Sequence, residues 1–118
     1  MKVINLTPHP LVLVNEGVET LGVIPPDGRL PRVQQTDRKV GELEIDGIGC
    51  IDIVETVFGK VCDLPEPFPG NLLVVSAITA LTARAGGRSV KDLLIPSDFV
   101  RDDAGVVIGC RRFARLSS

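Results

Sequence analysis

The segment VGELEIDGIGCIDIVETV, which runs from Val40 to Val57, decides how this chain folds. Apolar residues, many of them Val and Ile, lie on both sides of Asp46-Gly47, and β-branched residues favour strands. Aspartate and glycine tolerate the positive φ angles of a two-residue turn. The segment therefore predicts a β-hairpin that turns at Asp46-Gly47.

This turn fixes the register that we expect for the hairpin. On one face the expected cross-strand pairs are Ile45 with Ile48, Leu43 with Cys50, and Gly41 with Asp52. The other face is expected to carry Glu44, Glu42, Val40, Ile51 and Ile53. Both faces then hold apolar residues, so the hairpin is either sandwiched inside the domain or covered on one face by a second subunit.

The rest of the chain has the same β character. Val, Ile and Thr are abundant, and their stiff side chains favour strands. Clusters of Pro, Gly, Asn and Asp separate short apolar runs at turn-like intervals. The predicted strands cover residues 2–6, 11–14, 18–24, 29–34, 40–45, 48–57, 72–75 and 106–116.

One helix is predicted after Ser76, over residues 77–85. The Ser76 side chain can accept a backbone N–H bond at the helix start, and Gly86-Gly87 supplies a left-handed stop. Because Ile78, Leu81 and Ala85 recur at helical spacing, we expect this stripe to pack on the sheet.

Length and composition limit the class of protein. A chain of 118 residues with 44% hydrophobic and 24% charged residues predicts one folded domain over residues 1–118, not a disordered tail. We expect an α+β fold, a mainly antiparallel β-sheet with one short helix packed on it. No apolar run approaches the roughly 18 residues of a membrane span, and the start is unlike a signal peptide, so we expect no membrane association and a cytoplasmic protein.

The cysteines do not follow a metal or disulfide pattern. Cys50, Cys62 and Cys110 form no C-x-x-C pair, and His9 is the only histidine. Zinc sites need four closely arranged ligands. We expect three free thiols, no metal and no cofactor.

The charge is unevenly distributed along the chain. Residues 1–83 hold six Lys/Arg and eleven Asp/Glu, whereas residues 84–118 hold seven and four. This asymmetry predicts a basic C-terminal surface that attracts an anion or an acidic partner. The net charge of −2 and the aromatic content of 3% argue against binding of long nucleic acid.

The last predicted strand carries the clearest candidate for a binding surface. Alternation places Arg111, Phe113 and Arg115 on one face beside Gly109, where another group could approach the backbone. Guanidinium groups bind phosphate through two parallel hydrogen bonds and stack on flat rings. This face predicts a phosphate-bearing, nucleotide-like ligand. The alternative is that Arg111 and Arg115 pair with carboxylates on adjacent strands, namely Glu42, Glu44 or Asp102.

Catalytic patterns are largely missing. No G-x-S-x-G, G-x-G-x-x-G or phosphate-binding loop motif is present, and Asp102-Asp103 has the composition of a turn. His9 lies between Pro8 and Pro10 in a stiff segment. We therefore expect a protein that is not an enzyme, with a small hydrolase using His9 as an alternative.

Four segments together carry a family resemblance. They are INLTPH (4–9), TVFG (56–59) followed by LPEP (64–67), VVS (74–76), and VRDD (100–103) running through to IGCR (108–111). In this order they resemble a family of short, mostly uncharacterised proteins of bacteriophages, prophages and bacteria. The chain is also similar to the phage sponge proteins that counter Thoeris defence by sequestering cyclic ADP-ribose-type signals. That similarity implies a small oligomer that binds without cleaving, and it assigns no binding residue.

These observations predict a non-enzymatic phage or prophage accessory protein that sequesters a small anionic, nucleotide-derived signal in the host cytoplasm as a homo-oligomer. The alternative from a different class is a protein-interaction or virion-assembly module. The candidate ligand-binding residues are Arg111, Phe113, Arg115, Arg101, Gly109, His9, Thr7 and Phe58.

Overall fold

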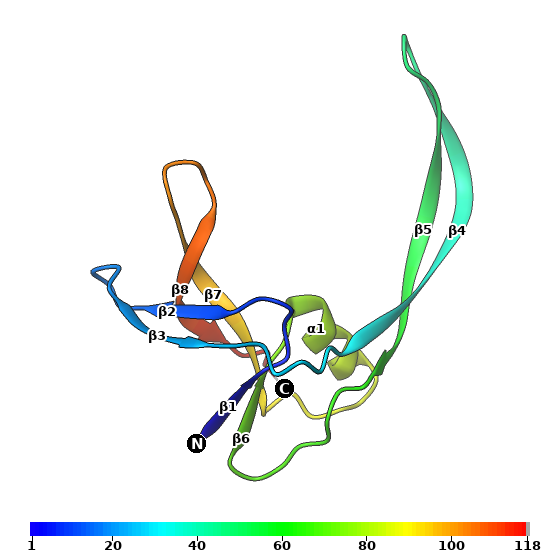
Figure 1. Cartoon of the computed structure of the whole chain (residues 1–118). Helices are drawn as coiled ribbons and strands as arrows, with labels where there is room; N and C mark the ends of the chain where they lie inside the picture. Colours follow the sequence, from blue (N-terminus) through cyan, green and yellow to red (C-terminus); the bar gives the residue numbers. More distant parts are fainter. Residues whose placement is uncertain (118) are drawn as a thin grey trace.

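The computed structural model describes residues 1–117 as a curled sheet, a projecting hairpin and one helix (Figure 1). The α+β class with mostly β structure is confirmed. In chain order the elements are β1 (Lys2–Asn5), β2 (Leu11–Val14), β3 (Thr20–Ile24), β4 (Arg32–Ile45), β5 (Gly49–Cys62), β6 (Asn71–Val74), α1 (Ala77–Ala85), β7 (Leu93–Arg101) and β8 (Val107–Ala114).

The main sheet has six strands in the order β1-β6-β7-β8-β2-β3, and β4 and β5 form a separate two-stranded sheet. The pairs β2–β3, β7–β8 and β4–β5 are antiparallel. The pairs β1–β6, β6–β7 and β2–β8 are parallel, so the main sheet is mixed. Most of the paired residues lie in the antiparallel hairpins, as the sequence predicts.

The two edge strands of the main sheet meet at Asn5. The backbone of Asn5 forms an isolated parallel bridge with Pro26, just beyond β3. The amide of Asp27 donates to the Asn5 carbonyl at 2.8 Å. The sheet therefore curls until its first and last strands touch at one point.

The buried side chain of Asn5 holds the same junction. Its Nδ2 donates to the carbonyls of His9 at 2.8 Å and Ile24 at 3.1 Å. Its Oδ1 accepts from the backbone amide of Thr7 at 2.9 Å and from the Thr7 hydroxyl at 2.6 Å. One amide group thus links β1, the turn that follows it and the end of β3.

Apolar side chains pack on both faces of the curled sheet. One cluster of buried residues packs with α1: Ile4, Leu6, Leu73, Val75, Ala80, Ala83, Val90 and Leu93. A smaller cluster contains Leu11 of β2 together with Val74 of β6 and Leu94 of β7. The alternation of Leu73, Val74 and Val75 between the clusters is what a strand covered on both faces requires.

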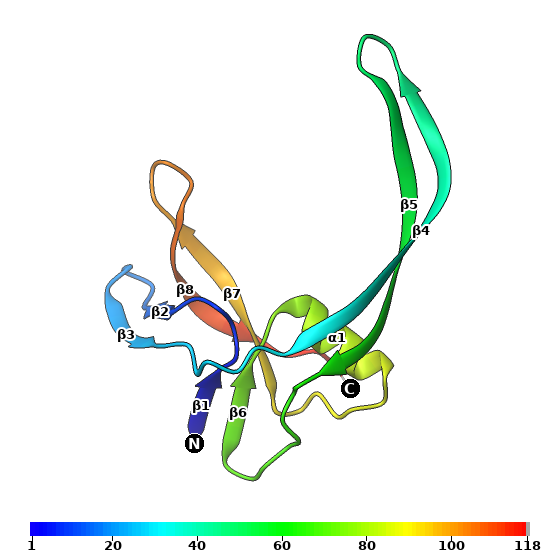
Figure 2. The ribbon, with the colours of Figure 1, turned by 45° about the vertical axis from the view of Figure 1, so that its right-hand side comes forward.

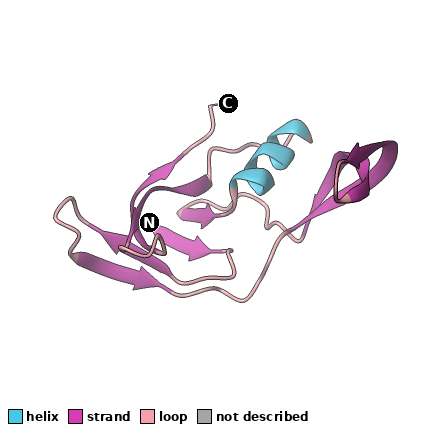
Figure 3. Cartoon of the chain, turned by 90° about the horizontal axis from the view of Figure 1, so that it is seen from above, coloured by secondary structure: helices cyan, strands magenta, loops and turns pink. Residues whose placement is uncertain are grey.

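The helix begins and ends as predicted, but it packs through a different face. Ser76 accepts from the Thr79 amide at 3.3 Å and caps the N-terminus. The expected apolar stripe is wrong, because Ile78 and Leu81 remain about 40% exposed (39% and 42%). The buried positions are Thr79, Ala80, Thr82 and Ala83. These small side chains allow the helix to approach the neighbouring strands closely. Helix α1 lies between the main sheet and the hairpin (Figure 3).

The hairpin differs from the prediction in register. Its loop has three residues, Asp46 to Ile48, so Ile45 lies opposite Gly49 instead of Ile48. Gly47 and Gly49 both have positive φ, 77° and 118°, and the second glycine allows the strands to close one residue later. Leu43 therefore lies opposite Ile51.

The hairpin also differs in length and position. Residues 35–39, predicted as a gap between two strands, continue β4. Figure 2 shows the hairpin projecting away from the remainder of the chain, so it is not sandwiched inside the domain. Every residue from Gly49 to Lys60 is exposed.

Strand β7 was not predicted, because Pro96 and Asp98 interrupt its apolar pattern. Only Leu93 and Leu94 pair with β6. Pro96 lies beyond this contact and faces Phe113 of β8. A proline, which lacks a backbone N–H, is tolerated where a strand has a neighbour on one side only.

Replacement of Asn5 by Ala is expected to lower the free energy of unfolding by about 3 kcal/mol and the Tm by about 10 °C, because buried partners lose their hydrogen bonds. The control is Asn15→Ala, which removes one hydrogen bond to the Glu19 amide in an exposed turn. That variant should lose less than about 1 kcal/mol. Urea unfolding of both variants provides the test, and equal stability of Asn5→Ala and the unmodified protein would contradict the role of Asn5.

Candidate functional site

The arginines of the last strand are engaged in ion pairs. Arg111 Nη1 lies 3.5 Å from Asp98 Oδ1, and its Nε lies 3.9 Å from Glu16 Oε2. Arg112 contacts the same two carboxylates, with 2.9 Å from Nη2 to Glu16 Oε1 and a close contact to Asp98. Arg111 thus has carboxylate partners, but they are Asp98 and Glu16 and not the three considered from the sequence. The cluster joins the β2–β3 turn to β7 and β8.

Three of the other candidates on and near β8 also have structural contacts. Phe113 packs against the smaller core cluster. Gly109 is buried, and a Cβ at this position would lie 3.0 Å from the Val12 carbonyl oxygen, so β2 itself occupies the space beside it. Arg101 donates to the Gly105 carbonyl at 2.9 Å. Arg115 is exposed, and no carboxylate within residues 1–117 pairs with it.

The remaining candidates lie elsewhere. Thr7 and His9 belong to the turn that Asn5 organises, and the contacts of His9 are made by its backbone carbonyl. Phe58 lies on β5 and lines a groove of about 350 Å³ with Ile78 and Leu81. The eight predicted residues therefore occupy separate regions and do not form a common site.

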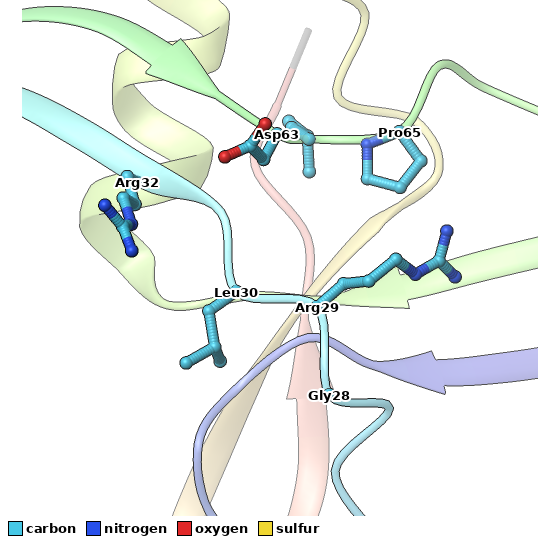
Figure 4. Close-up of a pocket in the computed structure, with 7 residues that line it drawn as sticks. Gly28, Arg29, Leu30, Arg32, Asp63 and Pro65 are labelled. Atoms are coloured by element: carbon cyan, nitrogen blue, oxygen red, sulfur yellow. The ribbon is translucent and has the colours of Figure 1, made fainter.

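A cavity lies at the base of the hairpin. It has a volume of about 640 Å³ and is formed by the segment that enters β4 and the segment that leaves β5 (Figure 4). Its lining residues are Gly28, Arg29, Leu30, Arg32, Asp63, Leu64 and Pro65.

A second cavity of about 300 Å³ adjoins the first. Both are lined by Leu30 and Arg32, and the second also contains Thr7, Ser76 and Thr79. It lies at the N-terminus of α1. We refer to the two cavities together as the root cleft.

Charged groups are arranged asymmetrically in the root cleft. Arg29 Nε donates to Asp27 Oδ2 at 2.6 Å, and this hydrogen bond lowers the pKa of Asp27. Arg32 has no carboxylate partner within residues 1–117. Asp63 presents its carboxylate from the opposite wall (Figure 4). The first turn of α1 has no acidic residue to offset its partial positive charge.

This arrangement offers groups for two kinds of hydrogen-bonding partner. The Arg32 guanidinium can bind a phosphate or carboxylate through paired N–H donors. The Asp63 carboxylate can accept from a hydroxyl or amine. A ligand that carries both an anionic group and hydroxyl groups, as a nucleotide does, matches both walls.

Arg32 and Asp63 are not among the residues predicted from the sequence. Three of the sequence segments quoted in the sequence analysis meet at the root cleft. INLTPH contributes Thr7, LPEP contributes Leu64 and Pro65, and VVS contributes Ser76. Their common location is invisible in the sequence because it depends on how β1, β5 and β6 are placed.

The thiols are free, with Cys50 exposed and Cys110 buried, and burial raises the pKa of the Cys110 thiol. Within residues 1–117 no three metal-ligating side chains gather into a cluster. No helix in that part of the chain is long and apolar enough to cross a membrane.

Comparison with known proteins found no similar one: no protein-family model, curated protein or solved structure matches the chain.

A packing role for Gly109 predicts that Gly109→Ala lowers stability by about 1–3 kcal/mol, because the new methyl group pushes against β2. Gly22→Ala is the matched control, since a Cβ at Gly22 meets nothing within 4 Å. Thermal unfolding followed by circular dichroism measures both. An unchanged Tm for Gly109→Ala would show that the space beside Gly109 is open to a ligand.

Proposed function

We propose that this protein binds and sequesters a small anionic, nucleotide-derived ligand in the root cleft without converting it. The observation that carries the proposal is the position of Arg32. Its guanidinium has no carboxylate partner within residues 1–117, and it lies where two adjoining cavities meet. A cationic group in such a position is suited to an anion.

The size of the root cleft supports a ligand of nucleotide scale. Its two cavities measure about 640 and 300 Å³, and small-molecule sites commonly measure about 300–1,000 Å³. Phosphate oxygens would bind Arg32, with the N-terminus of α1 adding a favourable field. Ribose hydroxyls would bind Asp63 on the opposite wall.

The lining of the root cleft supports binding over turnover. Neither cavity is lined by a histidine or a cysteine. The hydroxyl of Ser76 lies 2.9 Å from that of Thr79 and also caps the helix, so no base is positioned to activate it as a nucleophile. We propose further, from the resemblance to phage and prophage proteins stated for the sequence, that the protein acts in the host cytoplasm as a homo-oligomer.

A second candidate function, assembly with other proteins, is favoured by a specific observation. The hairpin β4–β5 projects from the chain with large apolar side chains exposed, among them Leu43, Ile51 and Ile53. Such a surface fits a protein-interaction module.

Isothermal titration with ADP-ribose, cyclic ADP-ribose and inorganic phosphate tests the proposed ligand class. Arg32→Gln should weaken nucleotide binding by about 10- to 100-fold, the equivalent of one bidentate charged contact. Arg38→Gln is the control, because Arg38 pairs with Glu55 on the exposed hairpin. The absence of heat with every nucleotide, or equal affinity of Arg32→Gln and Arg38→Gln, would contradict the proposal.

Arg111→Gln separates the root cleft from the last strand. Because Arg111 is paired with Asp98 and Glu16, we expect this variant to lose stability while retaining affinity. Loss of binding at an unchanged Tm would instead assign the ligand to β8.

A further inference from the structure

Residues 40–57, the distal part of the hairpin, are exposed to solvent over most of their length in the described structure. We call this part the distal arm. Among the described elements, α1 is the main neighbour of β4 and β5. It lies at the base of the hairpin, where Phe58, Ile78 and Leu81 meet in a groove. The distal arm therefore stands in solvent over most of its length (Figures 1 and 2).

The observed register makes the distal arm amphipathic near its tip. Leu43 pairs with Ile51, and the next pair on the same face brings in Ile53 opposite Gly41. The opposite face carries Glu42 across from Asp52, and Lys39 pairs with both carboxylates. A ribbon with one apolar face and one charged face has the pattern of a strand pair that is covered on one side.

An uncovered ribbon of this kind is not stable by itself. An isolated two-stranded hairpin is marginal in water and needs further strands or a packed surface. Leu43 and Ile51 are about half exposed (51% and 50%). The chain has a radius of gyration of 17.8 Å, whereas a compact chain of this length would have about 13.5 Å. A partner that covers the apolar face would remove this exposure.

We propose that the distal arm packs on a second copy of this chain. The charges favour this occupant. The distal arm holds five carboxylates and no Lys, Arg or His, whereas residues 84–118 hold an excess of basic residues. Glu44 and Asp46, near the tip, have no cationic partner within residues 1–117. The distal arm is therefore acidic, whereas the rest of the chain holds 13 Lys/Arg and ten Asp/Glu and so has an excess of positive charge.

The end of the β7–β8 hairpin is the surface that matches the arm. Phe99, Val107 and Ile108 are each between 43% and 50% exposed, and they line a shallow cleft. Arg101 pairs with Val107 in the sheet register and has no carboxylate partner within residues 1–117. Apolar contact with Leu43 and Ile51 would cover both apolar surfaces, with Arg101 as the cationic group in a turn that also carries Asp102 and Asp103.

The buried area favours a reciprocal arrangement. The longer strand of the distal arm has nine residues, 49–57, so the arm presents a face about 30 Å long and about 10 Å wide, and one docked arm buries about 600 Å² in total. Stable interfaces bury about 1,200–2,000 Å². Two arms exchanged across a two-fold axis reach that range, and a single arm does not. The assembly is therefore a two-fold dimer in which each copy supplies an arm and a receiving surface.

The test compares neighbouring residues on opposite faces of the distal arm. Ile51→Glu places a carboxylate on the apolar face, and the matched control Cys50→Glu places one on the charged face. Sedimentation velocity at 50 µM protein, without ligand, should give about twice the 12.6 kDa chain mass for the unmodified protein and for Cys50→Glu. Ile51→Glu should sediment as a monomer, with at least a tenfold higher dimer dissociation constant. Both positions are exposed, so an unchanged circular dichroism spectrum is expected for each.

A third variant tests the receiving surface. Val107→Glu should also give a monomer if the arm packs on β7–β8. A dimer that survives Val107→Glu but not Ile51→Glu would overturn the assignment of that surface, because the arms would then pair with each other. A monomeric unmodified protein, or a dimer that survives Ile51→Glu, would overturn the proposal as a whole. Neither result depends on ligand binding, so failure here is separable from failure of the root-cleft proposal.

Discussion

The buried amide of Asn5 is the constraint on which the rest of this structure depends. A six-stranded sheet with free edges exposes unpaired backbone groups, and here the edges meet because Asn5 reaches from β1 to the end of β3. The same side chain satisfies the Thr7 amide and the His9 carbonyl. Buried polar groups cost free energy unless they are paired, so a fully bonded amide specifies one arrangement of the junction.

That junction also determines where the side chains of the root cleft lie. Once β3 is tied to β1, the chain that leaves β3 crosses the turn at Thr7 and carries Arg29 and Arg32 to the base of the hairpin. The return strand delivers Asp63 to the opposite wall of the same cavity. The root cleft is thus a consequence of the closed sheet, and the hairpin that borders it extends outward with an apolar face that the described chain leaves uncovered.

Local sequence patterns predicted those parts of the fold that depend on neighbours in the chain. The helix from Ala77 to Ala85, its Ser76 cap and a hairpin near Asp46-Gly47 follow from local chemistry, and all three are present. Two errors are local: the hairpin register differs because Gly49 also adopts positive φ, and Pro96 interrupts the apolar pattern of β7. Distant contacts decide the buried face of the helix, which contains Ala80 and Ala83 instead of Ile78 and Leu81. The candidate residues on β8 were chosen by alternation alone, which cannot show that Asp98 and Glu16 lie close enough to pair with Arg111. Arg32 was not predicted as a site residue because its cavity is formed by segments that are far apart in sequence.

We propose that an anionic ligand binds in the root cleft beside Arg32. The most direct measurement is a titration of isotopically labelled protein with ADP-ribose, followed by amide and guanidinium resonances in NMR spectra. We predict shifts concentrated at residues 6–8, 28–32, 63–65 and 76–79, with the Arg32 side chain among the most affected. Shifts concentrated at residues 109–115 with the root cleft unmoved, or no shifts at millimolar ligand, would contradict the account.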